Sequence, residues 1–484
     1  MPPRTPNQGG RLAGIGFKLR RLVQEDGLRG MLLGYLSSAV LCGGPWLISI
    51  ATLALMSRIL EGETALFSSL VVTVNILTLW AAGPFQFALT RYLSDRLYAA
   101  DIGRHSSAFL TSWCLGVAPA CGLFSLLLAV TPLHWSWKVQ ALALFGLTST
   151  VWMLLLFLGV VRAYRTLIGS FAVSNTVGAL SAFALGKLCV DSQWGMLVGY
   201  TLGQAVLVGL LLWVLLAEFP SHYLVWDEGA AASLRRFPAL TLAGALYYLG
   251  IWADKAYYRW MDPDSSVAGV NWLRCNPAYE QAAFLAQLTV LPALALFFLA
   301  VETDFFERFR EFFRELGGGA SLLQIRRAKA SMLHSLRQGA FQLVSWQAVI
   351  TLLACLLAPC WMPAGAVELG RVQMLGVYFQ TLLYFASVVL FYYELYAEAL
   401  RAIAVFALGN LLLTPLLPIG WGYVVGSLLG FGISVGQILR QLPDIDRLIF
   451  ERQPLALTEL GGLTGRVAAG GLGLITYTAG DADE

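Results

Sequence analysis

Residues 64–90 read TALFSSLVVTVNILTLWAAGPFQFALT, a run without a single charged side chain. At about 1.5 Å per residue, an α-helix of this length crosses the roughly 30 Å hydrocarbon core of a bilayer. A basic segment with Arg91 and Arg96 follows the run directly. The stretch therefore predicts a transmembrane helix, and this interpretation decides the fold class of the chain.

The composition of the whole chain agrees with a membrane protein. Its 484 residues are 58% hydrophobic and 13% charged, whereas soluble domains are about 25% charged. Such an apolar surplus predicts an integral protein with the lipid bilayer as its solvent. The formal net charge of +3 is too small to suggest binding to nucleic acid, and the seven cysteines lack the spacing of a disulfide framework.

Similar apolar runs recur along the sequence. We expect an all-α polytopic membrane protein with about twelve transmembrane helices. The expected spans cover 31–57, 64–90, 107–132, 138–161, 166–189, 195–219, 239–260, 278–301, 340–361, 373–393, 400–417 and 420–439.

The basic residues predict an orientation. Most of the 32 lysines and arginines lie in the N-terminal arm, in alternate loops and in the C-terminal tail. Because cytoplasmic loops of membrane proteins are enriched in these residues, both termini are expected in the cytoplasm. The resulting division is an amphipathic arm at 1–30, a six-helix half at 31–219, a cytoplasmic linker at 220–238, a second half at 239–440 that includes a cytoplasmic segment at 302–338, and a tail at 441–484.

Glycine and proline interrupt several predicted spans. Breaks are expected at Gly44-Pro45, at Gly83-Pro84 and at Pro292. Paired broken helices in two halves of a transporter often mark a binding site near the middle of the membrane. The alternative is that glycine and proline are simply more frequent in membrane helices.

The cytoplasmic segment at 302–338 has an amphipathic pattern. An aromatic face opposes a charged face, which predicts either a docking surface for a cytoplasmic partner or a helix in the lipid headgroup plane. The candidate docking residues are Phe305, Phe309, Phe312, Phe313, Arg308 and Arg314. Ser321 and Gln324 predict a capping box that opens a second, basic helix.

Sequence signatures of enzymes are missing. The chain contains no GxSxG, Walker A, HExxH or CxxC pattern. Its four histidines fall in predicted loops or loop helices. We therefore expect no catalytic residues, no metal site and no cofactor.

The stretch LGIWADKAYYRW at 249–260 places charges inside a predicted span. Asp254 has a short side chain and should face the interior of the bundle. Lys255 and Arg259 are expected to extend toward the membrane boundary. Asp254 lies about 100° around the helix from Lys255 and is not expected to pair with it.

A cargo path needs hydrogen-bonding and aromatic side chains in the spans. The candidates for such a path are Asp254, Lys255, Trp252, Tyr247, Tyr248, Trp46, Asn75 and Gln86.

Four segments together resemble the PelG family of inner-membrane proteins, which belongs to the Pel exopolysaccharide export system and to the flippase and multidrug/oligosaccharide exporter superfamily. They are RLAGIGFKLRRL at 11–22, GGPWLISI at 43–50, WADK at 252–255 and VETDFFERFREFFRELGGGASL at 301–322. The resemblance extends over the predicted membrane region, and the last segment is its most specific part.

The resemblance implies two six-helix lobes around a central cavity, located in the bacterial inner membrane. It implies a cargo polysaccharide rich in N-acetylgalactosamine and galactosamine, and it implies the cytosolic glycosyltransferase PelF and the membrane proteins PelD and PelE as partners. The family offers no catalytic residues to carry over. Two alternatives to an exporter of nascent polysaccharide stay open: a membrane scaffold that anchors the synthase, and a flippase for lipid-linked oligosaccharides.

Overall fold

The chain is described here from a computed structural model. The described residues are 65–98, 103–159, 164–220, 223–263, 265–267, 270, 272–294, 305–317 and 320–452. The first predicted span, with Gly44, Pro45 and Trp46, lies outside them.

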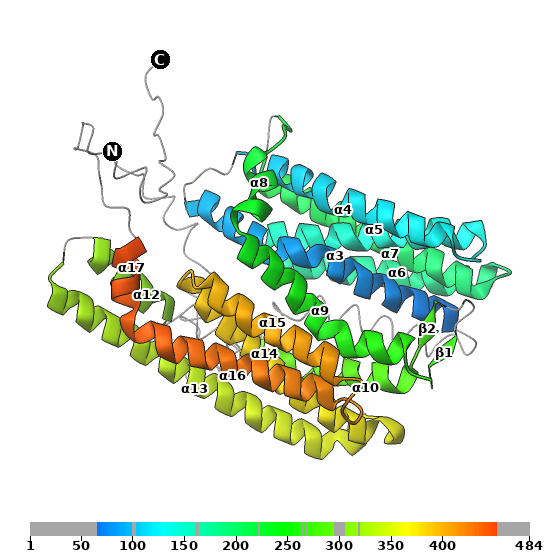
Figure 1. Ribbon diagram of the computed structural model, residues 1–484. Coiled ribbons are helices and arrows are strands. Elements are labelled where there is room, and N and C mark those ends of the chain that lie inside the picture. The colour runs from blue at the N-terminus through cyan, green and yellow to red at the C-terminus, as the bar shows by residue number, and fades with distance from the viewer. Residues whose placement is uncertain are drawn as a thin grey trace. The chain divides into compact units, whose positions relative to one another are not determined.

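Two helical bundles follow each other along the chain, and α9 lies between α3 and α15 (Figure 1). The first bundle contains α3 (Ala65–Tyr98), α4 (His105–Ala129), α5 (Trp135–Leu158), α6 (Tyr164–Leu188), α7 (Ser192–Glu218) and the short α8 (Glu228–Arg236). The second contains α9 (Pro238–Trp260), α10 (Pro277–Gln287), α12 (Phe306–Gly317), α13 (Leu322–Trp361), α14 (Val367–Tyr392), α15 (Tyr396–Leu413) and α16 (Trp421–Gln441).

Small elements complete the description. A two-residue antiparallel ladder joins β1 (Ser266–Val267) to β2 (Arg274–Cys275), with Ser266 opposite Cys275 and Val267 opposite Arg274. The chain divides into a large compact unit ending at Gln437 and a second unit that begins at Ile438. The second unit includes the end of α16, the 3-10 turn η3 (Leu442–Asp444) and α17 (Ile445–Arg452).

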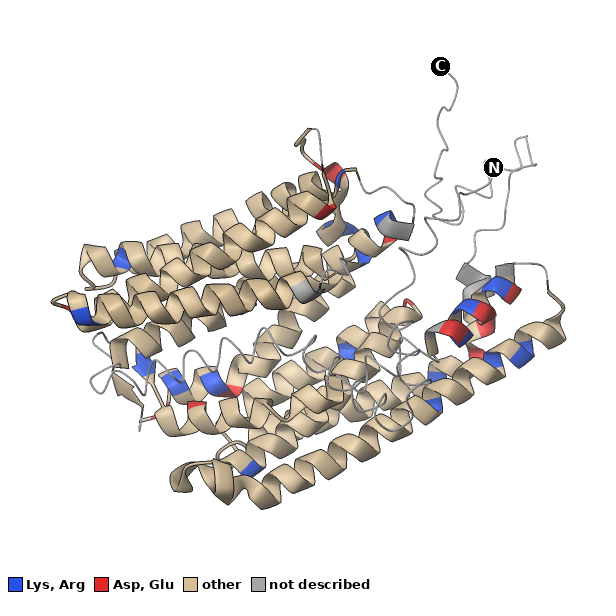
Figure 2. Cartoon of the chain, turned by 180° about the vertical axis from the view of Figure 1, so that it is seen from behind, with Lys and Arg blue, Asp and Glu red and all other residues tan. Residues whose placement is uncertain are grey.

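Nine of the described helices are long and apolar enough to cross a membrane, namely α3–α7 and α13–α16. The chain is an all-α polytopic membrane protein, as the sequence predicts. Figure 2 shows long stretches of these helices without charge. Most helix ends lie within a few residues of the predicted span boundaries. The exceptions include α3, which continues to Tyr98, and α10, which ends at Gln287. The largest is α13, which begins at Leu322 and merges the predicted basic helix with the following span into one helix of 40 residues.

The start of α13 follows from local hydrogen bonds. Ser321 accepts a hydrogen bond from the Gln324 amide, and the Gln324 side chain accepts one from the Ser321 amide. This capping box satisfies two amide donors that the first turn leaves free. The predicted capping box is confirmed.

The Gly83-Pro84 pair does not interrupt α3, which runs through both residues. The predicted break is therefore wrong at this position. Gly83 instead lies against α9: a Cβ atom built on Gly244 would lie 2.2 Å from the Gly83 carbonyl oxygen. The absence of side chains at both positions lets the backbones of α3 and α9 touch.

A helix break does occur ahead of Pro292. Helix α10 ends at Gln287, Leu288 and Thr289 form a turn, and helix resumes at Val290. Proline lacks an amide proton and clashes with the carbonyl four residues earlier, here that of Leu288. The neighbouring Thr289 carbonyl accepts a hydrogen bond from Nε2 of buried Gln347 on α13 at 3.0 Å.

Replacing Gln347 by leucine is expected to destabilise the protein by about 1–3 kcal/mol, because the buried Thr289 carbonyl would lose its donor. Thermal unfolding in detergent measures this loss. Gln338→Leu is the matched control, since Gln338 is exposed on the same helix, and it should leave the melting temperature nearly unchanged. Equal melting temperatures for the two variants would contradict the assigned role of Gln347.

The predicted linker at 220–238 contains an ordered helix, α8. Its N-cap Asp227 accepts a hydrogen bond from the Ala230 amide at 2.9 Å and another from the Tyr92 hydroxyl at 2.7 Å. Arg96 forms an ion pair with the same carboxylate. Burial alone would raise the pKa of Asp227, but these hydrogen bonds and the charge of Arg96 outweigh it and hold the pKa below its usual range. The start of α8 is therefore anchored to the end of α3.

The lowered pKa of Asp227 predicts a pH dependence. The carboxylate stabilises the docked α8 above the ordinary aspartate pKa of about 4, and this contribution disappears as the pH falls through the lowered value. Asp227→Asn should imitate the acid state at neutral pH: it keeps a side chain that can cap the helix but loses the charge that pairs with Arg96, so hydrogen exchange in α8 should accelerate a few-fold. Glu228→Gln, at an exposed neighbouring carboxyl, should not.

The aromatic face of α12 is partly covered by the chain itself. Phe305 and Phe309 pack against Tyr392, with ring centroids 5.7 and 5.6 Å apart, and Phe309 also lies 5.9 Å from Tyr393. Phe312 is fully buried, and half-buried Phe313 packs on Phe309 and Phe312. Phe305 and Phe312 are therefore buried inside the chain, while Phe309 and Phe313 stay partly exposed, and the part of this face in partner docking or lipid contact stays a prediction.

The charged face of α12 remains accessible. The side chains of Arg308 and Arg314 are 53% and 74% exposed, and Figure 2 shows acidic and basic residues along this helix. Their expected part in partner docking stays a prediction.

Candidate functional site

A charged pair lies at the centre of the second bundle, on α9. Asp254 is 0% exposed and Lys255 is 5% exposed. The interior position expected for Asp254 is confirmed. The Lys255 ammonium lies 3.1 Å from each carboxylate oxygen of Asp254. The expectation that these neighbours do not pair is wrong, because the flexible four-carbon stem of lysine turns back toward the carboxylate.

Three other helices supply hydrogen bonds to the Asp254 carboxylate. The Tyr279 hydroxyl of α10 donates at 2.6 Å, Asn410 of α15 donates at 3.0 Å and Gln373 of α14 donates at 3.4 Å. Asn410 also donates to the Gly250 carbonyl of α9 at 2.7 Å. The carboxylate therefore ties four helices together.

An aromatic ring covers the Lys255 ammonium. The nitrogen lies 4.0 Å from the ring centroid of Tyr423 on α16, a cation–π contact. Gly376 of α14 makes room for this ring, since a Cβ atom there would lie 2.4 Å from it. The Tyr423 hydroxyl donates a hydrogen bond to the side-chain oxygen of Gln380 at 3.4 Å. The side-chain nitrogen of Gln380 in turn donates to the Tyr247 hydroxyl.

Burying the charged groups of this network costs desolvation free energy. A buried ion pair must recover the hydration that both charges lose, and it does so through close pairing and additional hydrogen bonds. Asp254 meets this condition with four donors, and Lys255 with a carboxylate and a ring. We call the set Asp254, Lys255, Tyr279, Gln373, Asn410 and Tyr423 the buried charged network.

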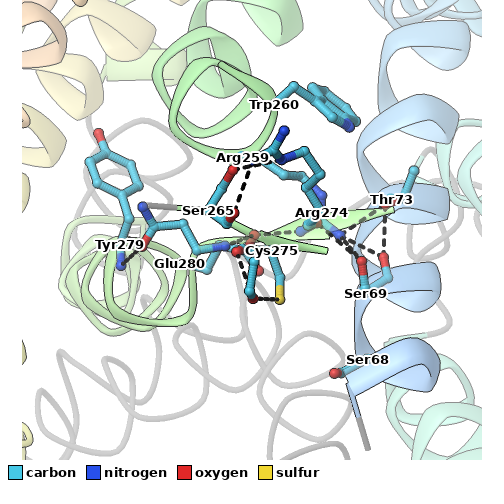
Figure 3. A network of polar contacts seen from close by, with 12 residues as sticks. Ser68, Ser69, Thr73, Arg259, Trp260, Ser265, Arg274, Cys275, Tyr279 and Glu280 are labelled. Atoms are coloured by element: carbon cyan, nitrogen blue, oxygen red, sulfur yellow. Dashed lines mark hydrogen bonds and ion pairs between the residues drawn. The ribbon is translucent and has the colours of Figure 1, made fainter. Parts of the chain in front are cut away.

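The second cation of α9 joins the two bundles. Arg259 is 1% exposed, so the expectation that its side chain extends outward is wrong, although it lies at the end of α9. Its guanidinium pairs with Glu280 of α10 and donates to the Ser69 carbonyl and hydroxyl of α3, each at 2.7 Å, and to the Thr73 hydroxyl at 2.9 Å. Figure 3 shows Arg259 reaching from α9 toward Ser69 and Thr73. We call these four residues the arginine clasp.

The segment between α9 and α10, which carries β1 and β2, strengthens this contact. Leu273 is fully buried within an apolar cluster of the first bundle that includes Phe67 and Leu70. The Ser69 hydroxyl donates to the Arg274 carbonyl at 3.1 Å. We call the described residues of this segment, 261–263, 265–267, 270 and 272–276, the α9–α10 hairpin, and this hairpin attaches the second bundle to the start of α3.

The far end of α3 also contacts the second bundle. The Arg91 guanidinium lies 2.7 Å from the Glu394 carboxylate, and Phe87 packs on Phe391 with centroids 4.9 Å apart. Ser69 and Arg91 are separated by roughly 33 Å along the helix, about the thickness of a bilayer. Helix α3 therefore holds the second bundle at both membrane faces.

The predicted path residues fall into different surroundings. Tyr247 connects to the buried charged network through Gln380. Tyr248 lies beside Gly83 at the α3 contact, and Trp252 is half-buried on the same helix. Asn75 donates to the Val71 carbonyl within α3. The structure does not bring Asn75 or half-buried Gln86 into the buried charged network.

Several network members were not singled out from the sequence. They are Tyr279, Gln373, Asn410 and Tyr423, and Gln380, which links the network to Tyr247, was not singled out either. A usable signal exists for two pairs: Gln373 and Gln380 are seven residues apart in one apolar span, and Asn410 and Thr414 are four apart in another. Both spacings place polar groups on one helix face, where they must find partners. Within the described residues, no three His, Cys, Asp or Glu side chains converge to hold a metal ion.

Solved structures of transporters share this fold. The eukaryotic MATE transporter AtDTX14 matches 90% of this chain and 99% of its own, with a TM-score of 0.52 and 14% identity. A MATE transporter in complex with MaL6 matches 85% and 97%, with a TM-score of 0.56 and 11% identity. A MOP-superfamily transporter from Pyrococcus furiosus matches 84% and 96%, with a TM-score of 0.54 and 11% identity. The fold is thus that of the two-lobed MOP-superfamily transporters.

A family model identifies the chain more closely. Residues 12–450 match PelG, described as "Putative exopolysaccharide Exporter (EPS-E)". The chain therefore belongs to the PelG exopolysaccharide exporter family. No curated protein sequence matches the chain.

Proposed function

We propose that this protein carries a nascent Pel-type polysaccharide, rich in N-acetylgalactosamine and galactosamine, from the cytoplasm to the periplasm. Membership of the exporter family over 12–450 carries this proposal, and the transporter fold supports it. The protein acts as a conduit and not as an enzyme. Extension of the polymer by the cytosolic glycosyltransferase PelF supplies direction, and PelD and PelE complete the membrane assembly.

The polar interior favours a transporter over a scaffold that merely anchors the synthase. A scaffold has no need of charged and amide side chains inside a helical bundle, where each must be paired. Here Asp254, Lys255, Gln373 and Asn410 are all buried in the second bundle. Groups of this kind offer alternative hydrogen-bond partners when helices rearrange, and transport requires rearrangement.

A flippase for lipid-linked oligosaccharides has weaker support. Such a carrier needs cations free to hold a diphosphate in the membrane. Among the described residues of α9, Lys255 is paired with Asp254 and Arg259 with Glu280. Neither cation is left to hold a diphosphate in this arrangement.

Reconstitution tests the proposed export. The protein is reconstituted into vesicles together with PelD and PelE in the membrane, and PelF and UDP-N-acetylgalactosamine are added on the outer side. Polymer is expected inside the vesicles and protected from added glycosidase. If all polymer is found outside the vesicles although the protein is intact in the membrane, the export proposal is contradicted and the scaffold function is favoured. Entry of preformed polymer without synthesis would contradict the coupling to PelF.

The proposed orientation predicts a labelling pattern in the inner membrane, with both termini cytoplasmic. Met261, 71% exposed at the end of α9, should face the periplasm, and exposed Arg326 near the start of α13 should face the cytoplasm. In a background without native cysteines, Met261→Cys should react with an impermeant maleimide in cells with a permeabilised outer membrane. Arg326→Cys should react only after the cells are lysed. The reverse labelling pattern would overturn the proposed topology.

A further inference from the structure

Three tryptophans meet where the α9–α10 hairpin touches α3. The rings of Trp80 on α3 and Trp260 on α9 lie 6.4 Å apart between centroids. The Trp260 indole donates to the Trp272 carbonyl at 2.9 Å. Trp260 directly follows Arg259, and Figure 3 shows both beside α3. We call Trp80, Trp260, Trp272 and Arg259 the tryptophan cluster.

The tryptophan cluster contains buried donors without acceptors. The indole nitrogens of Trp80 and Trp272 and the Nε of Arg259 are all buried and find no hydrogen-bond partner among the described residues. Buried polar groups are almost always paired, and an exception calls for an explanation. All three groups in this cluster are donors, so a ligand that satisfies them must bring acceptor oxygens.

The charge around the tryptophan cluster selects among such ligands. The Arg259 guanidinium is already neutralised by Glu280, so an anion would gain little from it and would face the Glu280 carboxylate. A sugar residue instead offers hydroxyl and acetamido oxygens to the donors. It also offers an apolar ring face to the indoles, whose large surfaces suit such contacts.

We propose that the tryptophan cluster binds a neutral sugar residue of the exported polymer, between α3 and the α9–α10 hairpin. This inference rests on the proposed polysaccharide cargo. The donors are covered while the arginine clasp is closed, so the sugar binds as the α9–α10 hairpin withdraws. Because binding needs the open arrangement, loosening the clasp must strengthen the apparent affinity.

Calorimetry on the purified full-length protein tests the proposal, with an N-acetylgalactosamine tetrasaccharide as the probe. Trp80→Phe and Trp272→Phe remove the indole N–H and should each weaken binding at least fivefold. Trp152→Phe is the matched control, because the Trp152 nitrogen on α5 is also buried without a partner but lies outside the cluster. It should bind within twofold of the unaltered protein. Ser69→Ala combined with Thr73→Val should bind more tightly.

Several outcomes would overturn the site. They are equal affinity in all tryptophan variants, no binding of the tetrasaccharide to the unaltered protein, or tighter binding of an oligogalacturonate or inorganic phosphate. If Trp80→Phe does not fold, 3-benzothienylalanine at position 80 removes the N–H and preserves the shape. Export in vesicles is measured separately. Tryptophan variants that lose binding but still export polymer would support the cluster as a contact site for sugar. Absence of export by the unaltered protein would contradict the proposed function and not the binding site.

Discussion

Asp254→Asn is expected to lower the free energy of unfolding by about 3–5 kcal/mol. The variant would leave Lys255 buried in the second bundle without its carboxylate, and breaking a buried ion pair from one side carries a cost of this size. Thermal unfolding in detergent and the amount of protein in the membrane both measure the loss. Ser434→Ala, at another buried polar side chain of the same bundle, serves as the control and should have a much smaller effect.

The double variant Asp254→Asn/Lys255→Met separates stability from transport. Removing both charges should restore most of the lost stability, since an apolar replacement of a buried pair is often neutral or stabilising. Export in vesicles is expected to stay low, because the hydrogen bonds of the carboxylate with Tyr279 and Asn410 cannot re-form in a second helix arrangement. If export returns together with stability, the pair serves the fold alone.

The helices could be predicted closely from the sequence because apolar runs and their basic flanks are local features. The run at 64–90 lies in α3, and Pro292 correctly indicated a helix break, which follows Gln287. The same local reasoning failed at Gly83-Pro84, where the helix continues. There the glycine serves the contact with Gly244, and no local pattern reveals which helix will lie opposite.

The site was harder to predict because its chemistry depends on partners distant in sequence. Asp254 could be assigned to the interior from its short side chain. Arg259 could not, since Ser69 and Thr73, nearly 190 residues earlier, hold it there. The aromatic face of α12 likewise gave no indication that Tyr392 and Tyr393 pack against it. Periodicity identifies a face that needs covering, but it does not identify the cover.

Arg259→Met is expected to release the α9–α10 hairpin from α3. The variant removes the ion pair with Glu280 and three hydrogen bonds to Ser69 and Thr73. Hydrogen bonds to a charged group contribute about 1.5–3 kcal/mol each in favourable cases. A net loss of roughly 3 kcal/mol would raise the open population about a hundredfold. Hydrogen exchange of the amides near Leu273 should accelerate by a similar factor.

Arg91→Met is the matched control: it is an identical substitution at the other contact between α3 and the second bundle, at the end of α3 that lies away from Ser69. The side chains of Arg91 and its partner Glu394 are 33% and 50% exposed, and exposed ion pairs contribute about 0–1 kcal/mol. Exchange in the hairpin should therefore change little. If Arg259→Met also leaves the exchange rate unchanged, the insertion of Leu273 among Phe67 and Leu70 holds the bundles together without the clasp. A hairpin released by Arg259→Met and unaffected by Arg91→Met would place the control of opening at the Ser69 end of α3.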